Sequence, residues 1–143
     1  VCEPPTDPYA CSGYRLPTEA EWEVAARCGD DYLFSGSDDA DLVAWHEENS
    51  GDELQPVALL APNSCGLHDM SGNLFEWTND YKDREYYVAS GRTDPIGPSE
   101  GSDWIVRGGR AHLDESYSRV SKRSHTGNRS SGAITVRVAR TIE

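Results

Sequence analysis

A twelve-residue stretch, Gly66–Trp77, constrains the fold of this chain more than any other segment. It reads Gly-Leu-His-Asp-Met-Ser-Gly-Asn-Leu-Phe-Glu-Trp. Its glycines, Ser and Asn disfavour a helix, and its mixed charged, amide and aromatic side chains lack the alternation of a strand. Such a mixture is typical of a tight loop that holds an ion and then carries its aromatic residues into a core. We therefore expect a fold that consists largely of ordered loops rather than helices and strands.

The length and composition favour one loop-rich domain over residues 1–143. Apolar residues make up only 36 % of the chain, while it contains 13 Gly and 8 Pro. Four Trp and seven Tyr supply a core of moderate size. No apolar run approaches the roughly 18 residues of a membrane span, so we expect no membrane insertion.

Charge is distributed unevenly along the chain, whose net charge is −12. Residues 1–103 contain 5 Lys and Arg against 22 Asp and Glu, and residues 104–143 contain 8 against 3. The acidic part argues against nucleic acid as a partner, because phosphates would be repelled. The basic end is suited to an anion or an acidic partner. The alternative is that its arginines pair with the acidic body.

The four cysteines predict two disulfides. No C-x-x-C pair occurs, which argues against zinc. Cys2 and Cys11 would close a small loop, leaving Cys28 to pair with Cys65. Such bridges indicate an oxidising compartment and therefore an extracellular, cell-surface or periplasmic location. The alternative is four reduced thiols in a cytosolic protein.

One helix is predicted with a clear start. Thr18 is a good N-cap and Glu21 completes a capping box, while Gly29 provides a C-terminal stop. We place this helix at residues 18–28. Short strands are predicted at residues 43–45, 56–59, 104–107 and 134–139, and long loops connect them.

Two carboxylates flank Gly72 in the opening stretch. Asp69 and Glu76, with backbone carbonyls exposed by a glycine turn, suit a hard cation such as calcium. The alternative is a plain turn in which Asp69 accepts from backbone N–H groups and Glu76 is salt-bridged. No H-E-x-x-H, G-x-S-x-G or phosphate-loop motif is present.

Several segments together resemble the formylglycine-generating enzyme (sulfatase-modifying factor) family. They are Tyr14–Glu23, Pro62-Asn63, Gly66–Trp77, Val106–Gly109 with its R-G-G, Arg119–Arg123 with its R-x-x-x-R, and Val136-Arg137 near the closing G-F-R. The resemblance implies an α+β, C-type lectin-like fold with little regular structure, short antiparallel strands and one or two helices. It also implies an N-terminal half that this chain lacks, so the chain is either the C-terminal part of a longer protein or a minimal form.

The resemblance also assigns metal ligands. It implies a structural calcium ion held by the side chains of Asp69 and Glu76 and by the carbonyls of Gly72 and Leu74. The oxidase members of the family hold copper on a cysteine pair after the Gly-Gly. Here the matching segment, Arg110–Ser118, contains no cysteine, so the thiolate ligands that copper(I) prefers are missing. We expect no copper and no formylglycine-generating activity.

The remaining hypothesis is a non-catalytic ligand-binding or display module. The window Arg110–Thr135 resembles the variable segment of diversity-generating retroelement proteins, because it is rich in residues that mutated Asn codons encode. We predict a binding face for a protein or glycan ligand, made by Arg110, His112, Asp114, Ser116, Tyr117, Ser118, His125, Thr126, Asn128 and Arg129. The alternatives are an ordinary polar loop, a copper-dependent oxidase completed by residues outside this chain, and a structural or regulatory appendage of a larger protein.

Overall fold

The computed structural model describes residues 2, 7–88, 93–127 and 134–141. Asn128 and Arg129, two residues of the predicted binding face, lie outside this described part. The helices are η1 (Pro8–Ala10), α1 (Glu19–Arg27), α2 (Ala40–Val43) and η2 (Glu115–Ser118). The strands are β1 (Ala44–Trp45), β2 (Ser71–Gly72), β3 (Phe75–Tyr81), β4 (Trp104–Arg107), β5 (Ser124–Thr126) and β6 (Ile134–Thr135).

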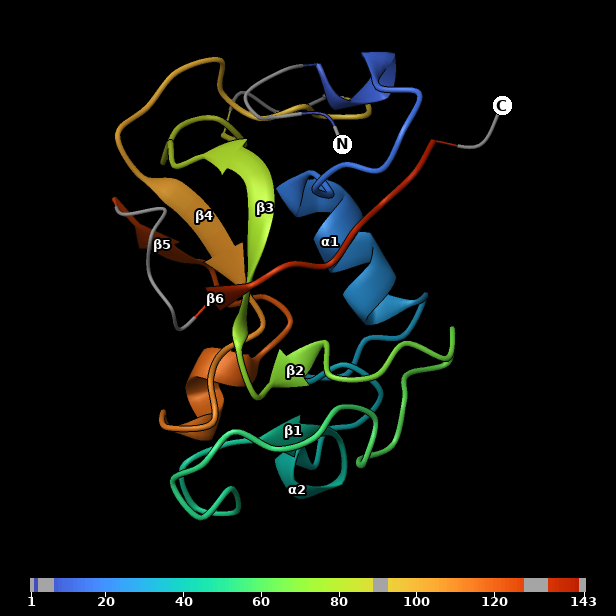
Figure 1. The fold of residues 1–143 in the computed structure, drawn as a ribbon, viewed down its shortest axis with the longest axis vertical. Helices are drawn as coiled ribbons and strands as arrows, with labels where there is room; N and C mark the ends of the chain where they lie inside the picture. The colour runs from blue at the N-terminus through green and yellow to red at the C-terminus, as the bar shows by residue number, and fades with distance from the viewer. Residues whose placement is uncertain (1, 3–6, 89–92, 128–133, 142–143) are drawn as a thin grey trace.

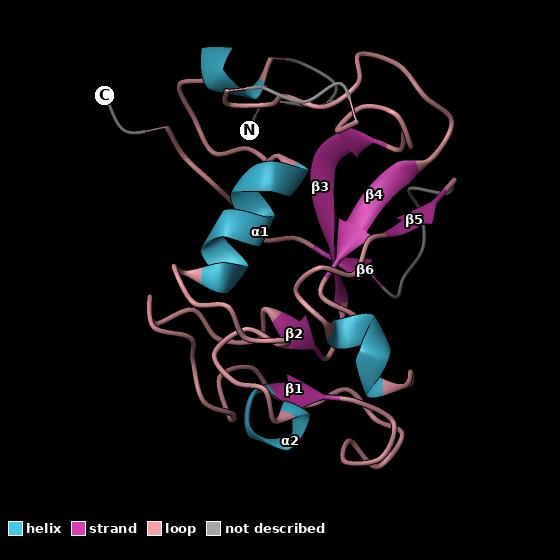
Figure 2. Ribbon diagram, turned by 180° about the vertical axis from the view of Figure 1, so that it is seen from behind, coloured by secondary structure: helices cyan, strands magenta, loops and turns pink. Residues whose placement is uncertain are grey.

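A four-stranded sheet in the order β5-β4-β3-β6 forms one half of the molecule. β4 pairs antiparallel with β3 and β5, while the short β6 runs parallel to β3. The other half contains the parallel pair β1–β2 and α2, with η2 between the halves and α1 beside the sheet (Figures 1 and 2). The predicted α+β class is confirmed, although two of the strand pairs are parallel rather than antiparallel.

Helix α1 begins as its sequence predicts. The Thr18 hydroxyl accepts the N–H of Glu21, and the Glu21 carboxylate accepts the N–H of Thr18. Its inner face buries Trp22 and Ala26, which pack with Met70 and Val120. Val24 faces solvent. The capping box and the apolar stripe therefore fix both the start of the helix and the side that it buries.

A buried arginine joins α1 to the sheet. Arg107, at the end of β4, donates to Glu19 at 2.6 Å and to Glu23 at 2.7 Å, and its side chain is 1 % exposed. Glu19 also receives two hydrogen bonds from Arg123, each 2.7 Å long. Basic residues of the C-terminal segment thus pair with the acidic body, which is the alternative that the charge distribution left open. Removing only one partner of such a buried ion pair lowers the stability of the fold, because the other charge stays buried without compensation.

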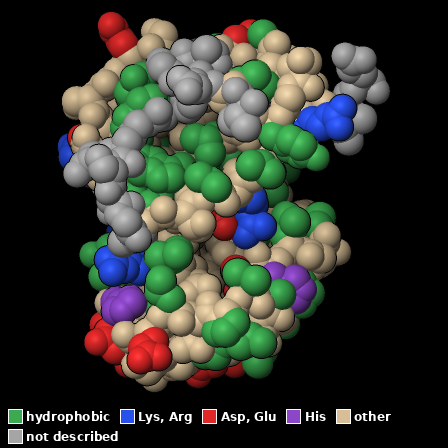
Figure 3. Space-filling view, in the orientation of Figure 1, with side chains coloured by type: hydrophobic (Ala, Val, Ile, Leu, Met, Phe, Trp, Pro, Cys, Tyr) green, Lys and Arg blue, Asp and Glu red, His purple; other side chains and the backbone are tan. Residues whose placement is uncertain are grey.

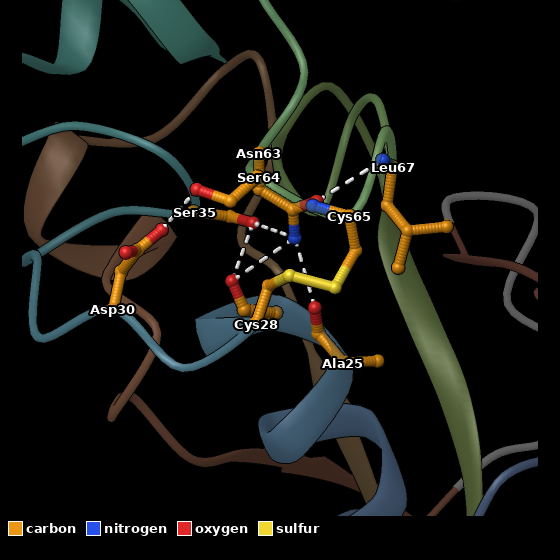
Figure 4. Close-up of a disulfide and its surroundings, with 9 residues drawn as sticks. Ala25, Cys28, Asp30, Ser35, Asn63, Ser64, Cys65 and Leu67 are labelled. Carbon is orange, nitrogen blue, oxygen red and sulfur yellow. Dashed lines mark hydrogen bonds between the residues drawn. A yellow bond between two sulfur atoms is a disulfide. The ribbon is translucent and has the colours of Figure 1, made fainter.

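Both predicted disulfides are confirmed as Cys2–Cys11 and Cys28–Cys65. Next to the second, the amide of Asn63 lies over the end of α1 (Figure 4). Its Nδ2 donates to the carbonyls of Ala25 and Ala26, and its Oδ1 accepts the N–H of Leu67. One side chain and one covalent bridge therefore attach the loop before residue 66 to the helix.

Two strand predictions are corrected by the structure. Residues 56–59 form a turn, because Ala58 has φ +61° and its N–H is bonded to Asp69. The closing strand is limited to Ile134–Thr135; farther along, Ala139 forms an isolated bridge with Arg15. Strand β3 extends well past Trp77, into a stretch whose polar sequence predicts no strand.

Candidate functional site

A basic pocket of about 450 Å³ lies where η2 and its flanking loops meet the four-stranded sheet, and each of the four strands contributes to its lining. Its floor is apolar and is made by Phe75, Val106, Leu113 and Ile134. Its polar lining is made by Arg110, Tyr117, Lys122, Arg123, Ser124, His125 and Thr126. Among the described residues no acidic side chain lines it, although the chain as a whole is acidic. We call this cavity the basic pocket.

Two glycines bring Arg110 to this pocket. Gly108 and Gly109 have φ +93° and +86°, a backbone conformation that other residues rarely adopt. A Cβ on Gly109 would lie 2.5–2.8 Å from Ser118, so the chain can pass here only without a side chain. Arg110 follows directly, and its Nε is buried without a hydrogen-bond partner within the described residues. The R-G-G segment therefore turns β4 sharply into the pocket wall.

The structure brings four of the predicted binding residues together: Arg110, Tyr117, His125 and Thr126 all line the basic pocket. Four others, His112, Asp114, Ser116 and Ser118, lie outside its lining. His112 approaches Asp52 at 3.7 Å, while Asp114 caps η2 by accepting the N–H of Ser116. That hydrogen bonding with Ser116 lowers the pKa of Asp114. Whether any of these residues contacts a ligand stays a prediction.

The prediction that Ser118 belongs to the binding face is wrong. Its side chain is fully buried, because η2 packs Ser118 directly against Gly109. It cannot contribute to a surface, and its hydroxyl has no hydrogen-bond partner within the described residues. Sequence reasoning also missed Lys122 and the apolar floor. Lys122 and Arg123 belong to the R-x-x-x-R segment, whose spacing was the available signal.

The charged groups of the pocket differ in how they are compensated. Arg123 is paired with Glu19, and this hydrogen bonding raises the pKa of Arg123 above its ordinary value. The ammonium of Lys122 lies 4.7 Å from the ring centre of Tyr117. His125 lies between Lys82, at 2.6 Å, and Asp103, at 3.4 Å. In the tautomer in which Nε2 of His125 accepts from Lys82, the N–H at Nδ1 is directed toward Asp103.

The stretch Gly66–Trp77 surrounds a second cavity, of about 380 Å³. Three predicted calcium ligands, Asp69, Leu74 and Glu76, line it. The surface is hollowed at mid-height, where a basic and an acidic side chain meet (Figure 3). Gly72, the fourth predicted ligand, is needed for packing, since a Cβ there would lie 2.3–2.9 Å from the backbone of Trp45.

As arranged, this loop does not fit a calcium ion on Glu76. The buried carboxylate accepts two hydrogen bonds from Nε of Arg137 and one, at 2.7 Å, from its NH2 group, together with the Trp22 indole N–H at 2.7 Å. One oxygen of Asp69 accepts the N–H of Ala58. A cation on Glu76 has to displace Arg137. The geometry supports the alternative, a glycine turn with a salt-bridged Glu76, and calcium stays a prediction.

Comparison with known proteins identifies the family of this chain. The family model for the sulfatase-modifying factor enzyme 1-like domain matches residues 6–142. The chain belongs to this family. The formylglycine-generating enzyme of Streptomyces coelicolor is 36 % identical over 155 residues, which cover 90 % of this chain and 47 % of that enzyme. The family expected from the motifs is thereby confirmed.

Solved structures of the family agree. Treponema denticola variable protein 1 matches with a TM-score of 0.84 and 35 % identity over 91 % of this chain and 48 % of that one. PvdO from Pseudomonas aeruginosa matches with a TM-score of 0.76 and 27 % identity over 90 % and 53 %. The C-type lectin-like fold is therefore confirmed, and the chain spans about half the length of these relatives.

Two features bear on location. Both disulfides are typical of an oxidising environment. Within the part of the chain that the structure describes, no helix has the length and hydropathy needed to cross a bilayer.

Proposed function

We propose that this chain is a non-catalytic ligand-binding module whose binding face is centred on the basic pocket. The observation that carries the proposal is the coincidence of Arg110, Tyr117, His125 and Thr126 in one pocket. These residues come from the segment after Gly-Gly, where the oxidase members of the family are expected to carry copper-binding cysteines. A face of changeable side chains on a rigid scaffold is a general design for recognition.

The chemistry of the cysteines supports binding rather than oxidation. All four are consumed in disulfides, and none lies in the segment after Gly109. No thiolate of this chain is therefore left for copper(I). An oxidase remains a second candidate only if a partner supplies the ligands, and oxygen uptake with copper and a thiol peptide tests it. We expect no copper-dependent oxygen consumption.

We further propose that the segment is diversified by a retroelement, as its similarity to a variable protein suggests. The gene sequence tests this directly. We expect a near-copy of the segment for residues 110–135 nearby, differing at adenines. The absence of such a copy would remove diversification while leaving ligand binding untouched. On this proposal the module acts outside the cytoplasm, as its disulfides favour.

Selection from a random peptide display library tests ligand binding itself. We expect peptides that bind the wild-type chain and lose binding to a variant carrying Arg110→Ala, Tyr117→Ala and His125→Ala. The matched control carries Leu42→Ala and Arg119→Ala, which change exposed residues outside the pocket lining. Recovery of peptides that bind all three proteins equally contradicts the proposed face, as does a selection that yields no binder.

A further inference from the structure

The basic pocket carries charge that the protein itself does not neutralise. Arg110 and Lys122 line it, and among the described residues neither forms an ion pair. The Nε of Arg110 is buried without a hydrogen-bond partner there. Arg110 is half-buried, and a buried N–H without an acceptor is unfavourable, so an anion entering the pocket would supply the missing acceptor. The lining thus points to an anionic ligand.

Nearby acidic groups do not cancel this charge. Glu19 is engaged by Arg107 and Arg123, and Asp103 lies beside His125. Asp114 accepts from the N–H of Ser116 and is exposed to solvent. Figure 3 shows acidic side chains at the lower end of the molecule, in the half that contains β1 and α2. Because water and salt screen charges beyond about 8 Å, the basic residues of the lining itself contribute most to the charge that a ligand meets there.

The rest of the lining favours a peptide over a sugar. The four apolar floor residues offer a hydrophobic contact next to the two cations. The lining contains no Asp, Glu, Asn or Gln among the described residues to accept or share the hydroxyl hydrogen bonds of a sugar. The ammonium of Lys122 lies over the Tyr117 ring, 4.7 Å from its centre, where it competes with a sugar for that face of the ring.

We propose that the basic pocket binds a carboxylate side chain of an acidic peptide segment, with a neighbouring hydrophobic side chain on the apolar floor. Arg110 and Lys122 receive the carboxylate, and Phe75 and Ile134 contact its hydrophobic neighbour. Recognition of acidic motifs by clustered cations is a general mode of peptide binding. This inference rests on the proposed function and names its ligand.

Fluorescence anisotropy with a defined probe tests the proposal. The probe is a rhodamine-labelled peptide of alternating Glu and Phe, and its matched control replaces each Glu with the isosteric Gln. The protein variants are Arg110→Gln and Lys122→Gln. Arg119→Gln is the control variant, because Arg119 is exposed in the same segment, lies outside the pocket lining and carries the same charge. Thermal unfolding verifies that every variant folds.

We expect saturable binding of the Glu peptide at least tenfold tighter than that of the Gln peptide. Arg110→Gln and Lys122→Gln should each weaken it several-fold, and Arg119→Gln less than twofold. Equal binding of the two peptides, or equal loss in all three variants, overturns the acidic-ligand proposal. Saturable binding of heparin with none of the Glu peptide also overturns it, in favour of a sulfated glycan. Neutral peptides that still depend on Arg110 preserve the proposed function, whereas failure of every probe at the pocket counts against both.

Discussion

The buried carboxyl of Asp80 predicts that this protein becomes less stable as the pH rises from 5 to 8. Asp80 lies on β3 and is 1 % exposed. Its Oδ2 accepts the N–H of Glu19 at the start of α1, at 2.7 Å, while its Oδ1 has no partner within the described residues. Burial raises the pKa of Asp80 from 3.8 to about 7, with a smaller upward contribution from the charge of Glu19.

The direction of the effect follows from proton binding. Because the pKa is higher in the folded protein, that state holds an extra proton between about pH 4 and pH 7. Its contribution to stability is complete below pH 3.8 and is lost as the pH rises through about 7. The difference between the pKa values of Asp80 in the unfolded and folded protein corresponds to about 4 kcal/mol of free energy of unfolding. About 2–3 kcal/mol of it is lost between pH 5 and pH 8.

Urea unfolding of the wild type and of Asp80→Asn at pH 5, 6, 7 and 8 measures this contribution. The free energy of unfolding of Asp80→Asn, relative to wild type, should rise by about 2–3 kcal/mol over that range. The other groups that face Asp80, which are Glu19, Glu21, Arg123 and Tyr87, are present in both proteins. A difference that does not change with pH would refute the buried, protonated Asp80.

Three further outcomes are expected. Gly109→Ala should lower the free energy of unfolding by at least about 2 kcal/mol, because its Cβ meets Ser118; Gly29→Ala, with a similar φ but open space around it, should cost less, and equal losses in thermal melts would contradict this. Arg137→Met should lower the free energy of unfolding by about 3–5 kcal/mol, because Glu76 stays buried without its counter-charge. EDTA should leave the melting temperature of the wild type unchanged. A fall by several degrees on chelation would instead support the predicted calcium ion. Replacing Cys28 and Cys65 together with Ser should cost about 4 kcal/mol in denaturant unfolding, and no loss would show that α1 is held without the bridge.

The sequence predicted those elements whose stabilising contacts join residues close together in the chain. The capping box of Thr18 and Glu21 joins residues three apart, and α1 forms at that position. The disulfide pairs were predicted because Cys2 and Cys11 are close enough in the sequence to close a small loop, which leaves Cys28 and Cys65. The strand at residues 104–107 is apolar at three of four positions and lies wholly in the interior, as its composition predicts.

Strand β3 was missed as a whole, because residues 66–77 were interpreted as a loop and the part of the strand beyond Trp77 is polar. Thr78 donates to the carbonyl of Ile105, and Asp80 accepts from Glu19, so partners far apart in sequence satisfy these buried groups. The opposite error occurred at residues 56–59, where Val57 and Leu59 suggest a strand and are 76 % and 61 % exposed. A local hydrophobic pattern cannot show which polar groups find partners elsewhere.

The candidate site was predictable only in part for the same reason. The R-G-G and R-x-x-x-R segments mark its location, and four predicted residues do line one pocket. Ser118 was misplaced because its burial depends on contact with Gly109. The floor was missed because Phe75 and Ile134, which are paired neighbours in the sheet, lie far apart in the sequence.

The most direct test of the central claim is where a ligand binds. A ¹H–¹⁵N NMR titration of the whole chain with a peptide selected on it locates the contact residue by residue. We expect the largest shift changes at Arg110, Tyr117, Lys122 and His125 around the basic pocket. Changes centred on the Glu76–Arg137 cavity or on the N-terminal loop, with the pocket signals unmoved, would contradict the proposed binding face.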